Sequence, residues 1–163
     1  MPGLPYPLIN GNQYDWSSVE LNFGGVPLPL DGLKDLSYSD DLKPGKARGT
    51  HAQVSGRSRG TYDAEGSLTF YKSQWPVFLA AISAQAAARL AGYKEFAFTL
   101  TVSYSEVALG IQTDTLLGCR ITKDEDQHTE GGEVLVHKCT LDILQVNWNG
   151  TPPLLKSVIP AAP

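Results

Sequence analysis

Apolar and polar residues alternate with a period of two along most of the chain, a pattern typical of strands with one buried face. The clearest runs extend from Phe96 to Tyr104 and from Tyr62 to Phe70. Their polar faces carry Thr99, Thr101 and Ser103 in the first run, and Asp63, Glu65, Ser67 and Thr69 in the second. Shorter runs predict strands at Val19–Phe23, Leu33–Ser39 and Leu117–Ile121. The pattern therefore predicts a mainly β, antiparallel fold of the sandwich or barrel type.

The last predicted strand, from about Glu133 to Trp148, changes its apolar phase by one residue. The phase runs through Leu135, Cys139, Leu141 and Ile143 and then continues as Leu144, Val146 and Trp148. Such a slip predicts a bulge or a strand that passes from one sheet to another. A hairpin centred near Thr129 would place Cys119 directly opposite Cys139, as neighbouring thiols on the buried face. A disulfide there is sterically conceivable but not required.

One segment departs from the β pattern. Residues 73–91 are alanine-rich, and Ser73 is predicted to cap the helix, with Pro76 in its first turn and Gly92 as its stop. Helical spacing places a bulky stripe on one face: Trp75, Phe78, Leu79, Ile82 and Ala86. We expect this stripe to pack on the sheet, so that the helix flanks it.

Composition indicates one domain of 163 residues with a formal net charge of -4, which does not favour a stable nucleic-acid complex. Residues 1–14 and 151–163 are proline-rich arms on either side of a domain at 15–150. The first eight residues have neither a basic end nor a long apolar stretch, so we expect no signal peptide and no membrane span. Two cysteines are too few for a disulfide scaffold, and reduced core thiols are expected.

Two motifs could carry chemistry, but both lack the required context. Gly56 to Gly60 matches G-x-S-x-G around Ser58, yet a loop precedes it and a strand follows it, so the match is interpreted as chance. Asp124, Asp126 and His128 have the spacing of a calcium loop without its glycine and its final glutamate, which favours a solvated hairpin tip. His137 has no ligand partner at a suggestive spacing. We therefore predict no catalytic residue, no metal and no cofactor.

A long loop between strands, at about residues 39–60, contains the most unusual charge pattern. No acidic residue occurs from Leu42 to Tyr62, although Asp40 and Asp41 come directly before. The basic residues of this segment are Lys43, Lys46, Arg48, Arg57 and Arg59. A solvated loop and a docking loop both fit this pattern, whereas a nucleic-acid site would be expected to offer aromatic residues for stacking.

The segment from Leu33 to Trp75 resembles the signature region of bacteriophage tail tube proteins. Its features are Ser37-Tyr38 at the end of a strand, a long glycine-containing loop, a Gly-Arg-x-x-Gly turn at residues 56–60 and a strand before the helix. The later pieces FTLTVSYSE at 98–106 and DTLLGCRITK at 114–123 are also similar to the family, in the same order. The resemblance covers roughly Tyr14 to Gly150.

This resemblance implies a structural protein rather than an enzyme. Hexameric rings would stack into a hollow virion tube, assembled in the host bacterial cytoplasm, that conducts DNA without sequence-specific binding. The implied partners are further copies of the chain, a tape measure protein, a baseplate or tail-tip hub, a tail terminator and, for a contractile tail, a sheath. No membrane partner is expected. The tube of a contractile injection or type VI secretion system is the nearest alternative; a hydrolase using Ser58 and a nucleic-acid module using the basic loop are more distant ones.

Within that framework, two groups of residues are predicted to act in assembly. The ring-stacking loop comprises Asp40, Asp41, Lys43, Lys46, Arg48, Arg57 and Arg59, with its basic residues docking on Asp40, Asp41 or the hairpin at 124–133 of the next ring. The polar faces of the two clearest strands, from Asp63 to Thr69 and from Thr99 to Ser103, are candidates to face the lumen. Like charge on such a wall would keep DNA from adhering.

Overall fold

The computed structural model describes residues 19–24, 26–28, 32–50, 52–106 and 109–154. The arm at 1–14 and most of the arm at 151–163 lie outside the described residues. The elements in chain order are β1 (Val19–Phe23), β2 (Val26–Leu28), β3 (Leu33–Lys43), β4 (Lys46–Ala47), β5 (Gly56–Arg57), β6 (Thr61–Tyr71), α1 (Trp75–Ala87), β7 (Phe98–Glu106), β8 (Gly110–Gln127), β9 (Val136–Ile143) and β10 (Gln145–Asn147). The predicted mainly β, antiparallel fold with one helix is confirmed for these residues.

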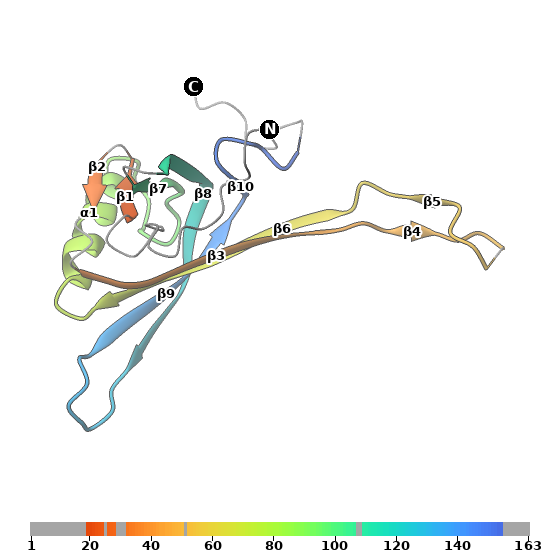
Figure 1. The fold of residues 1–163 in the computed structure, drawn as a ribbon. Coiled ribbons are helices and arrows are strands. Elements are labelled where there is room, and N and C mark those ends of the chain that lie inside the picture. Colours follow the sequence, from red (N-terminus) through yellow and green to blue (C-terminus); the bar gives the residue numbers. More distant parts are fainter. Residues whose placement is uncertain (1–18, 25, 29–31, 51, 107–108, 155–163) are drawn as a thin grey trace, which may run out of the picture.

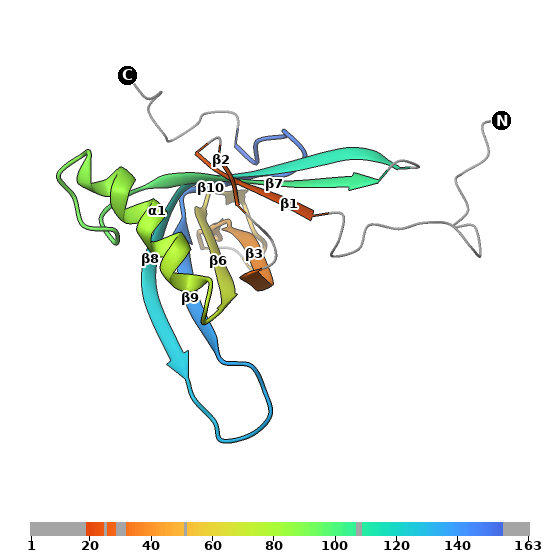
Figure 2. The same cartoon turned by 90° about the vertical axis from the view of Figure 1, so that its left-hand side faces the viewer.

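One antiparallel sheet curls around the hydrophobic core. Its strands run in the order β2-β1-β7-β8-β9-β6-β3, and β10 pairs with β8 beside this path. The long strand β8 belongs to both halves, because its first part pairs with β7 and β10 and its last part with β9. Figure 2 shows β1 and β7 crossing the direction of β6 and β9. Alternate residues of both halves, such as Leu68 and Leu100, meet in a single buried cluster.

Helix α1 packs its predicted bulky stripe against this core. Trp75, Phe78 and Ile82 are buried, and the Phe78 ring stacks on Phe70 of β6 with 4.6 Å between centroids. Pro76 lies in the first turn as predicted, but Ser73 as the cap and Gly92 as the stop were wrong. Gln74, without a side-chain capping bond, precedes the helix, which ends at Ala87 because Leu90 takes a left-handed φ of 55°. No helix among the described residues is long and apolar enough to cross a membrane.

The predicted phase slip near the C-terminus is confirmed as a change of partner. β9 pairs with β6, whereas β10 pairs with the first part of β8. Leu144 forms the bend between them, and its N–H donates to the carbonyl of Leu117 at 3.0 Å. Ile143 and Val146 are buried on either side, but Leu144 is 54% exposed. The predicted apolar phase is confirmed at Cys139, Leu141, Ile143 and Val146, which are buried. It was wrong at Leu135, Leu144 and Trp148, which are exposed.

The two cysteines are free and buried, as predicted, but they do not pair in the predicted register. Cys119 lies opposite Phe98 of β7, and Cys139 lies between Leu68 and Asp124. The hairpin is centred closer to residue 131 than to Thr129, because Ile121 pairs with Leu141. Burial raises the pKa of each thiol to about 12, so neither is a reactive thiolate at neutral pH.

Candidate assembly interface

The predicted loop at 39–60 is largely an extended β-hairpin. β3 and β6 stay paired out to Lys43 and Thr61, and the short strands β4 and β5 continue the ladder. β9 accompanies β6 only from Ala64 onward, so residues 41–63 extend beyond the body of the sheet, as Figure 1 shows. We call this segment the hairpin arm. The loop prediction was wrong for residues 39–43, 46–47 and 56–57, which form paired strands. These strands are short and interrupted, which hides the period-two pattern.

Tight backbone geometry holds the hairpin arm in shape. Gly60 has a φ of +83°, and a Cβ atom there would lie 2.5 Å from the carbonyl oxygen of Lys43. The Ser58 hydroxyl accepts a hydrogen bond from the Gly45 N–H at 3.0 Å, and the Ser58 N–H donates to the Gly45 carbonyl. The residue singled out by the hydrolase motif thus stabilises a turn. Ser58 lies in a hairpin rather than between a strand and a helix, as a nucleophile elbow requires.

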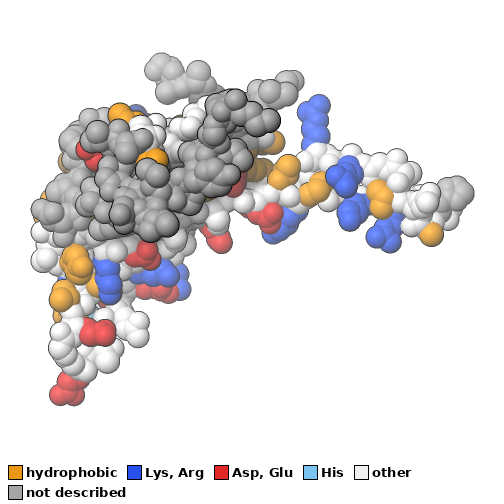
Figure 3. Space-filling view, viewed as in Figure 1, with side chains coloured by type: hydrophobic (Ala, Val, Ile, Leu, Met, Phe, Trp, Pro, Cys, Tyr) orange, Lys and Arg blue, Asp and Glu red, His pale blue; other side chains and the backbone are white. Residues whose placement is uncertain are grey.

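The hairpin arm exposes all five predicted basic side chains. Every residue of the segment from Leu42 to Thr61 that the structure describes is exposed, and Figure 3 shows lysine and arginine side chains along it. Among them, Lys43 forms an ion pair with Asp41 at 3.5 Å, which contributes little because both side chains are more than half exposed. A two-stranded hairpin is only marginally stable by itself in water, so this arm is suited to contact a partner surface.

An acidic hollow lies at the base of the hairpin arm. It has a volume of about 480 Å³, and its acidic lining residues are Asp40, Asp41, Asp63, Glu65 and Asp142. Asp41 lies directly opposite Asp63, and Glu65 directly opposite Asp142, so like charges face each other across two strand pairs. Arg120 faces Asp142 from β8, but no basic residue is directly opposite Asp63 or Glu65. Lys43 is the one basic lining residue of the hollow and pairs with Asp41. Facing like charges are destabilising, so the remaining carboxylates favour a basic partner.

Asp40 and Asp41, which sequence reasoning treated together, have different environments. The Asp40 carboxylate accepts hydrogen bonds from Tyr62 Oη at 3.0 Å and Trp148 Nε1 at 3.1 Å. Tyr62 Oη in turn accepts from the Val146 N–H at 3.0 Å. Asp40 therefore joins β3 to the C-terminal segment, whereas Asp41 is exposed on the opposite side of the strand.

The two groups of lumen candidates lie on opposite outer faces. Leu68 of β6 and Leu100 of β7 point into the shared core from the two halves of the sheet. The residues that alternate with them, Asp63 to Thr69 and Thr99 to Ser103, therefore point away from each other. The two groups therefore cannot both line the same surface, so at most one of them can face a lumen. The face of β6 is acidic at Asp63 and Glu65, whereas the predicted β7 positions carry only hydroxyl groups.

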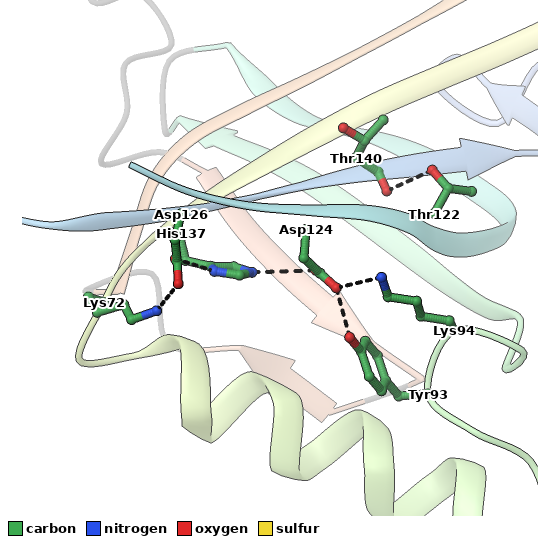
Figure 4. A network of polar contacts seen from close by, with 8 residues as sticks. All are labelled: Lys72, Tyr93, Lys94, Thr122, Asp124, Asp126, His137 and Thr140. Carbon is green, nitrogen blue, oxygen red and sulfur yellow. Dashed lines mark hydrogen bonds and ion pairs between the residues drawn. The ribbon is translucent and has the colours of Figure 1, made fainter. Parts of the chain in front are cut away.

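A polar network that sequence reasoning did not predict connects the β8–β9 hairpin to the helix. His137 is buried, and its ring stacks on Trp75 with 3.9 Å between centroids. Figure 4 shows its Nδ1 contacting Asp126 at 2.6 Å and its Nε2 contacting Asp124 at 3.4 Å. Each ring nitrogen of His137 thus faces a carboxylate of β8. Lys72 pairs with Asp126 from the turn before α1.

Asp124 is the centre of this network and belongs to strand β8 rather than to the predicted solvated tip. Its Oδ2 accepts from Tyr93 Oη at 2.7 Å and pairs with Lys94 Nζ at 3.0 Å. Burial by itself raises the pKa of Asp124, but the hydrogen bonds from Tyr93, Lys94 and His137 outweigh it and hold the pKa below its usual value. The network could have been predicted only from the pairing of Asp126 with His137 across the two strands. That pairing follows from the hairpin register, which the sequence pattern did not give.

A second internal cluster joins the edge strand β3 to β7 and β8. Tyr38 Oη donates to Asp114 Oδ2 at 2.5 Å and contacts Tyr104 Oη at 2.7 Å. The other Asp114 oxygen accepts from the Asn149 N–H at 2.8 Å. Burial raises the pKa of Tyr38, and the hydrogen bond to Asp114 adds to this effect. No group of acidic, histidine or cysteine side chains suited to a metal ion occurs among the residues described.

Comparisons with solved structures identify the fold. The tube-terminating cap of the anti-feeding prophage aligns with a TM-score of 0.62 and 12% identity, covering 90% of this chain and 97% of that chain. A chain of the sheath–tube complex of the extracellular contractile injection system PVC aligns with a TM-score of 0.59 and 11% identity, over 82% and 89%. The SPP1 tail tube protein aligns with a TM-score of 0.57 and 10% identity, over 82% and 77%.

A scan against protein-family models and a search of curated proteins found no match. The structural likeness nevertheless extends over 82–90% of the chain. The chain therefore has the tail tube fold, as the resemblance in its sequence predicted.

Proposed function

We propose that this chain is the structural subunit of a bacteriophage tail tube, in which hexameric rings stack into a hollow conduit for DNA during ejection. The likeness to tube proteins over 82–90% of the chain carries this proposal. Similar folds can serve different functions, so the proposal also needs support from surfaces of this chain.

The free edges of the curled sheet support ring formation. β3 is an end strand of the sheet and is 11 residues long, with β6 as its one strand partner among the described residues. Its unpaired backbone groups can add to a sheet of another copy, and a closed ring of copies removes such edges. We therefore expect strand pairing between neighbouring copies, which a monomer cannot form, to close the ring.

We place the outer face of β6, with Asp63, Glu65, Ser67 and Thr69, on the lumen. Asp63 and Glu65 belong to the acidic hollow, so this face would repel the DNA phosphates. The β7 residues Thr99, Thr101 and Ser103 would then lie on the outside of the tube, because they occupy the opposite face.

The hairpin arm is proposed to stack rings by docking on the acidic hollow of a neighbouring ring. Its basic side chains complement part of the five carboxylates of that hollow, and the remaining carboxylates keep the lumen face acidic. Exposed ion pairs contribute only about 0.2–1 kcal/mol each, so several must act together and fix the register between rings. Asp41 contributes to the hollow, while Asp40 is engaged inside its own subunit.

Negative-stain microscopy of the purified protein tests the proposal directly. Wild-type protein should form six-fold rings and hollow tubes, and the double variant Arg57→Glu/Arg59→Glu should form rings but few or short tubes. Lys123→Glu is the matched control, because Lys123 is exposed on β8 and lies outside both the arm and the acidic hollow. Wild-type protein that stays monomeric at high concentration would refute the proposed function, and unchanged tube lengths in the double variant would refute the role of the arm.

A tube of a contractile injection system is the second candidate. The anti-feeding prophage cap and the PVC sheath–tube chain align with this chain at TM-scores of 0.62 and 0.59, compared with 0.57 for the SPP1 tail tube. Particles isolated from the producing cells distinguish the two functions: DNA-filled virions with this chain in their tails support the phage tube, and DNA-free contractile particles support the alternative.

The proposed location is the tail of the virion, after assembly in the host bacterial cytoplasm. The proposed partners are further copies of the chain, a tape measure protein, a baseplate or tail-tip hub, a tail terminator and, if the tail contracts, a sheath. Among the proteins compared, chains from a cap and from a sheath–tube complex have this fold, which is consistent with such neighbours.

A further inference from the structure

The outer face of α1 is apolar although it faces solvent. Val77 is 58% exposed, and Ala80, Ala84 and Ala88 follow it at spacings of three and four residues on the same side of the helix. No charged residue occurs between Lys72 and Arg89. The opposite face, with Phe78 and Ile82, already fills the core.

A helix that is apolar all round is normally buried all round. The core of this subunit explains only one of the two faces of α1. A second apolar stripe in water weakens solubility without adding to the packing of the monomer, and such a patch on a surface marks a contact with another molecule. The alanines also leave room for a projecting side chain to approach the helix backbone closely.

A matching projection lies on the other side of the molecule. The β7–β8 hairpin extends to the right in Figure 2, whereas α1 lies to the left. Ile111 near its tip is 72% exposed, and Leu109 is 46% exposed. Glu106 is the only charged residue in the segment 96–113. A helix face without charge and a hairpin end with exposed apolar side chains and one charged residue thus lie on opposite sides of one chain.

We propose that the outer face of α1 receives the β7–β8 hairpin of a second copy of this chain, with Ile111 packing between Ala80, Ala84 and Ala88. A head-to-tail contact between different patches repeats from copy to copy and closes into a ring when the rotation allows it. A patch that is covered permanently in an assembly can be more apolar than one for a transient partner. The inference rests on the proposed function and specifies which surfaces join neighbours within a ring.

Engineered cysteines test this contact. Ala84→Cys combined with Ile111→Cys should give, after mild oxidation, a ladder of cross-linked species on a non-reducing gel that ends at the size of the ring. An equimolar mixture of the two single variants should give no species longer than a dimer, because each chain then has one new thiol. Cys119 and Cys139 are buried and should not interfere.

Ala84→Cys combined with Val134→Cys is the matched control. Val134 is 68% exposed, near the tip of the β8–β9 hairpin, and is not part of the proposed contact. If the proposed contact is specific, this control pair should form about ten times less cross-linked product than the proposed pair.

A charge swap provides an independent readout. Ala84→Glu should abolish rings while the monomer folds, because the position is exposed and glutamate is a good helix former. Ile111→Lys should do the same, and the combination of both substitutions should restore rings. Circular dichroism of each variant verifies that the monomer is folded.

The outcomes separate the contact from the proposed function. Rings and tubes in the wild type, with no specific cross-link and with rings still formed by Ala84→Glu, would overturn the contact and leave the tube function standing. A wild type that forms neither rings nor tubes would instead overturn the proposed function. A ladder together with rescue by the double charge variant supports the contact.

Discussion

Asp124→Asn offers the sharpest test of how the β8–β9 hairpin is attached to the rest of the subunit. Asp124 receives hydrogen bonds from Tyr93 at 2.7 Å and His137 at 3.4 Å, besides its ion pair with Lys94. Its side chain is 17% exposed, so water screens these contacts only in part. The substitution keeps the size of the side chain and removes its charge.

The expected cost follows from the hydrogen bond that loses its charged acceptor. A hydrogen bond to a charged group contributes about 1.5–3 kcal/mol. The contact with His137 is long, and the Lys94 side chain is about half exposed, so the Tyr93 bond is the main one counted. We therefore expect Asp124→Asn to lower the free energy of unfolding by about 2 kcal/mol, which corresponds to a fall in Tm of about 4–8 °C for a chain of this size.

The pH dependence has a defined sign. Because the pKa of Asp124 is lowered in the folded state, the folded chain binds fewer protons than the unfolded chain in mild acid. The stabilisation is complete above the unfolded pKa of about 3.9 and is lost as the pH falls below it. The stability difference between wild type and Asp124→Asn should therefore be full at neutral pH and shrink toward low pH.

Urea unfolding of dilute, monomeric protein, followed by tryptophan fluorescence at several pH values, measures this difference. Asp142→Asn serves as the control, because Asp142 is exposed and should change stability by less than about 0.5 kcal/mol. A difference for Asp124→Asn that stays constant down to acid pH, or one no larger than that of the control, would refute this account of the network.

Three further outcomes are expected. Tyr38→Phe should lower the free energy of unfolding by about 1–3 kcal/mol in urea, since Asp114 loses its hydrogen bond from Tyr38 and keeps the one from Asn149; an unchanged midpoint would contradict this. Gly60→Ala should strain the hairpin arm and reduce tubes in micrographs, whereas Gly56→Ala, with open space around its Cβ position, should not; equal tube counts would count against this role of the arm. Both native thiols should react with a thiol reagent only after unfolding, and fast labelling of folded protein would disprove their burial.

Short-range patterns were enough to predict the class of fold and much of the core. Alternation placed Leu68, Phe70, Leu100 and Val102 on buried faces, and all four are buried. The stripe on α1 and the change of sheet after Ile143 were also predicted, because helical spacing and a phase slip are local properties of the chain. The resemblance of Leu33 to Trp75 to tail tube proteins was confirmed at the level of the fold.

Long-range register could not be predicted in the same way. The predicted pairing of Cys119 with Cys139 failed because a shift of a few residues in the hairpin changes every facing pair. The network of Asp124 and His137 depends on that same register. The opposite orientation of the β6 and β7 polar faces depends on how the sheet curls, which alternation along one strand does not specify.

The amino-acid sequence by itself determined most of the residues that are buried in the strands, where the one helix of the described chain lies, and that a basic stretch is free of acids. Only the tertiary structure decided that this stretch is a projecting hairpin arm, that like charges gather at its base, and that α1 keeps an apolar face in solvent. The physical reason is the separation along the chain of the residues involved. Burial patterns depend on residues that are close in sequence, whereas surfaces for assembly form where segments distant in sequence meet.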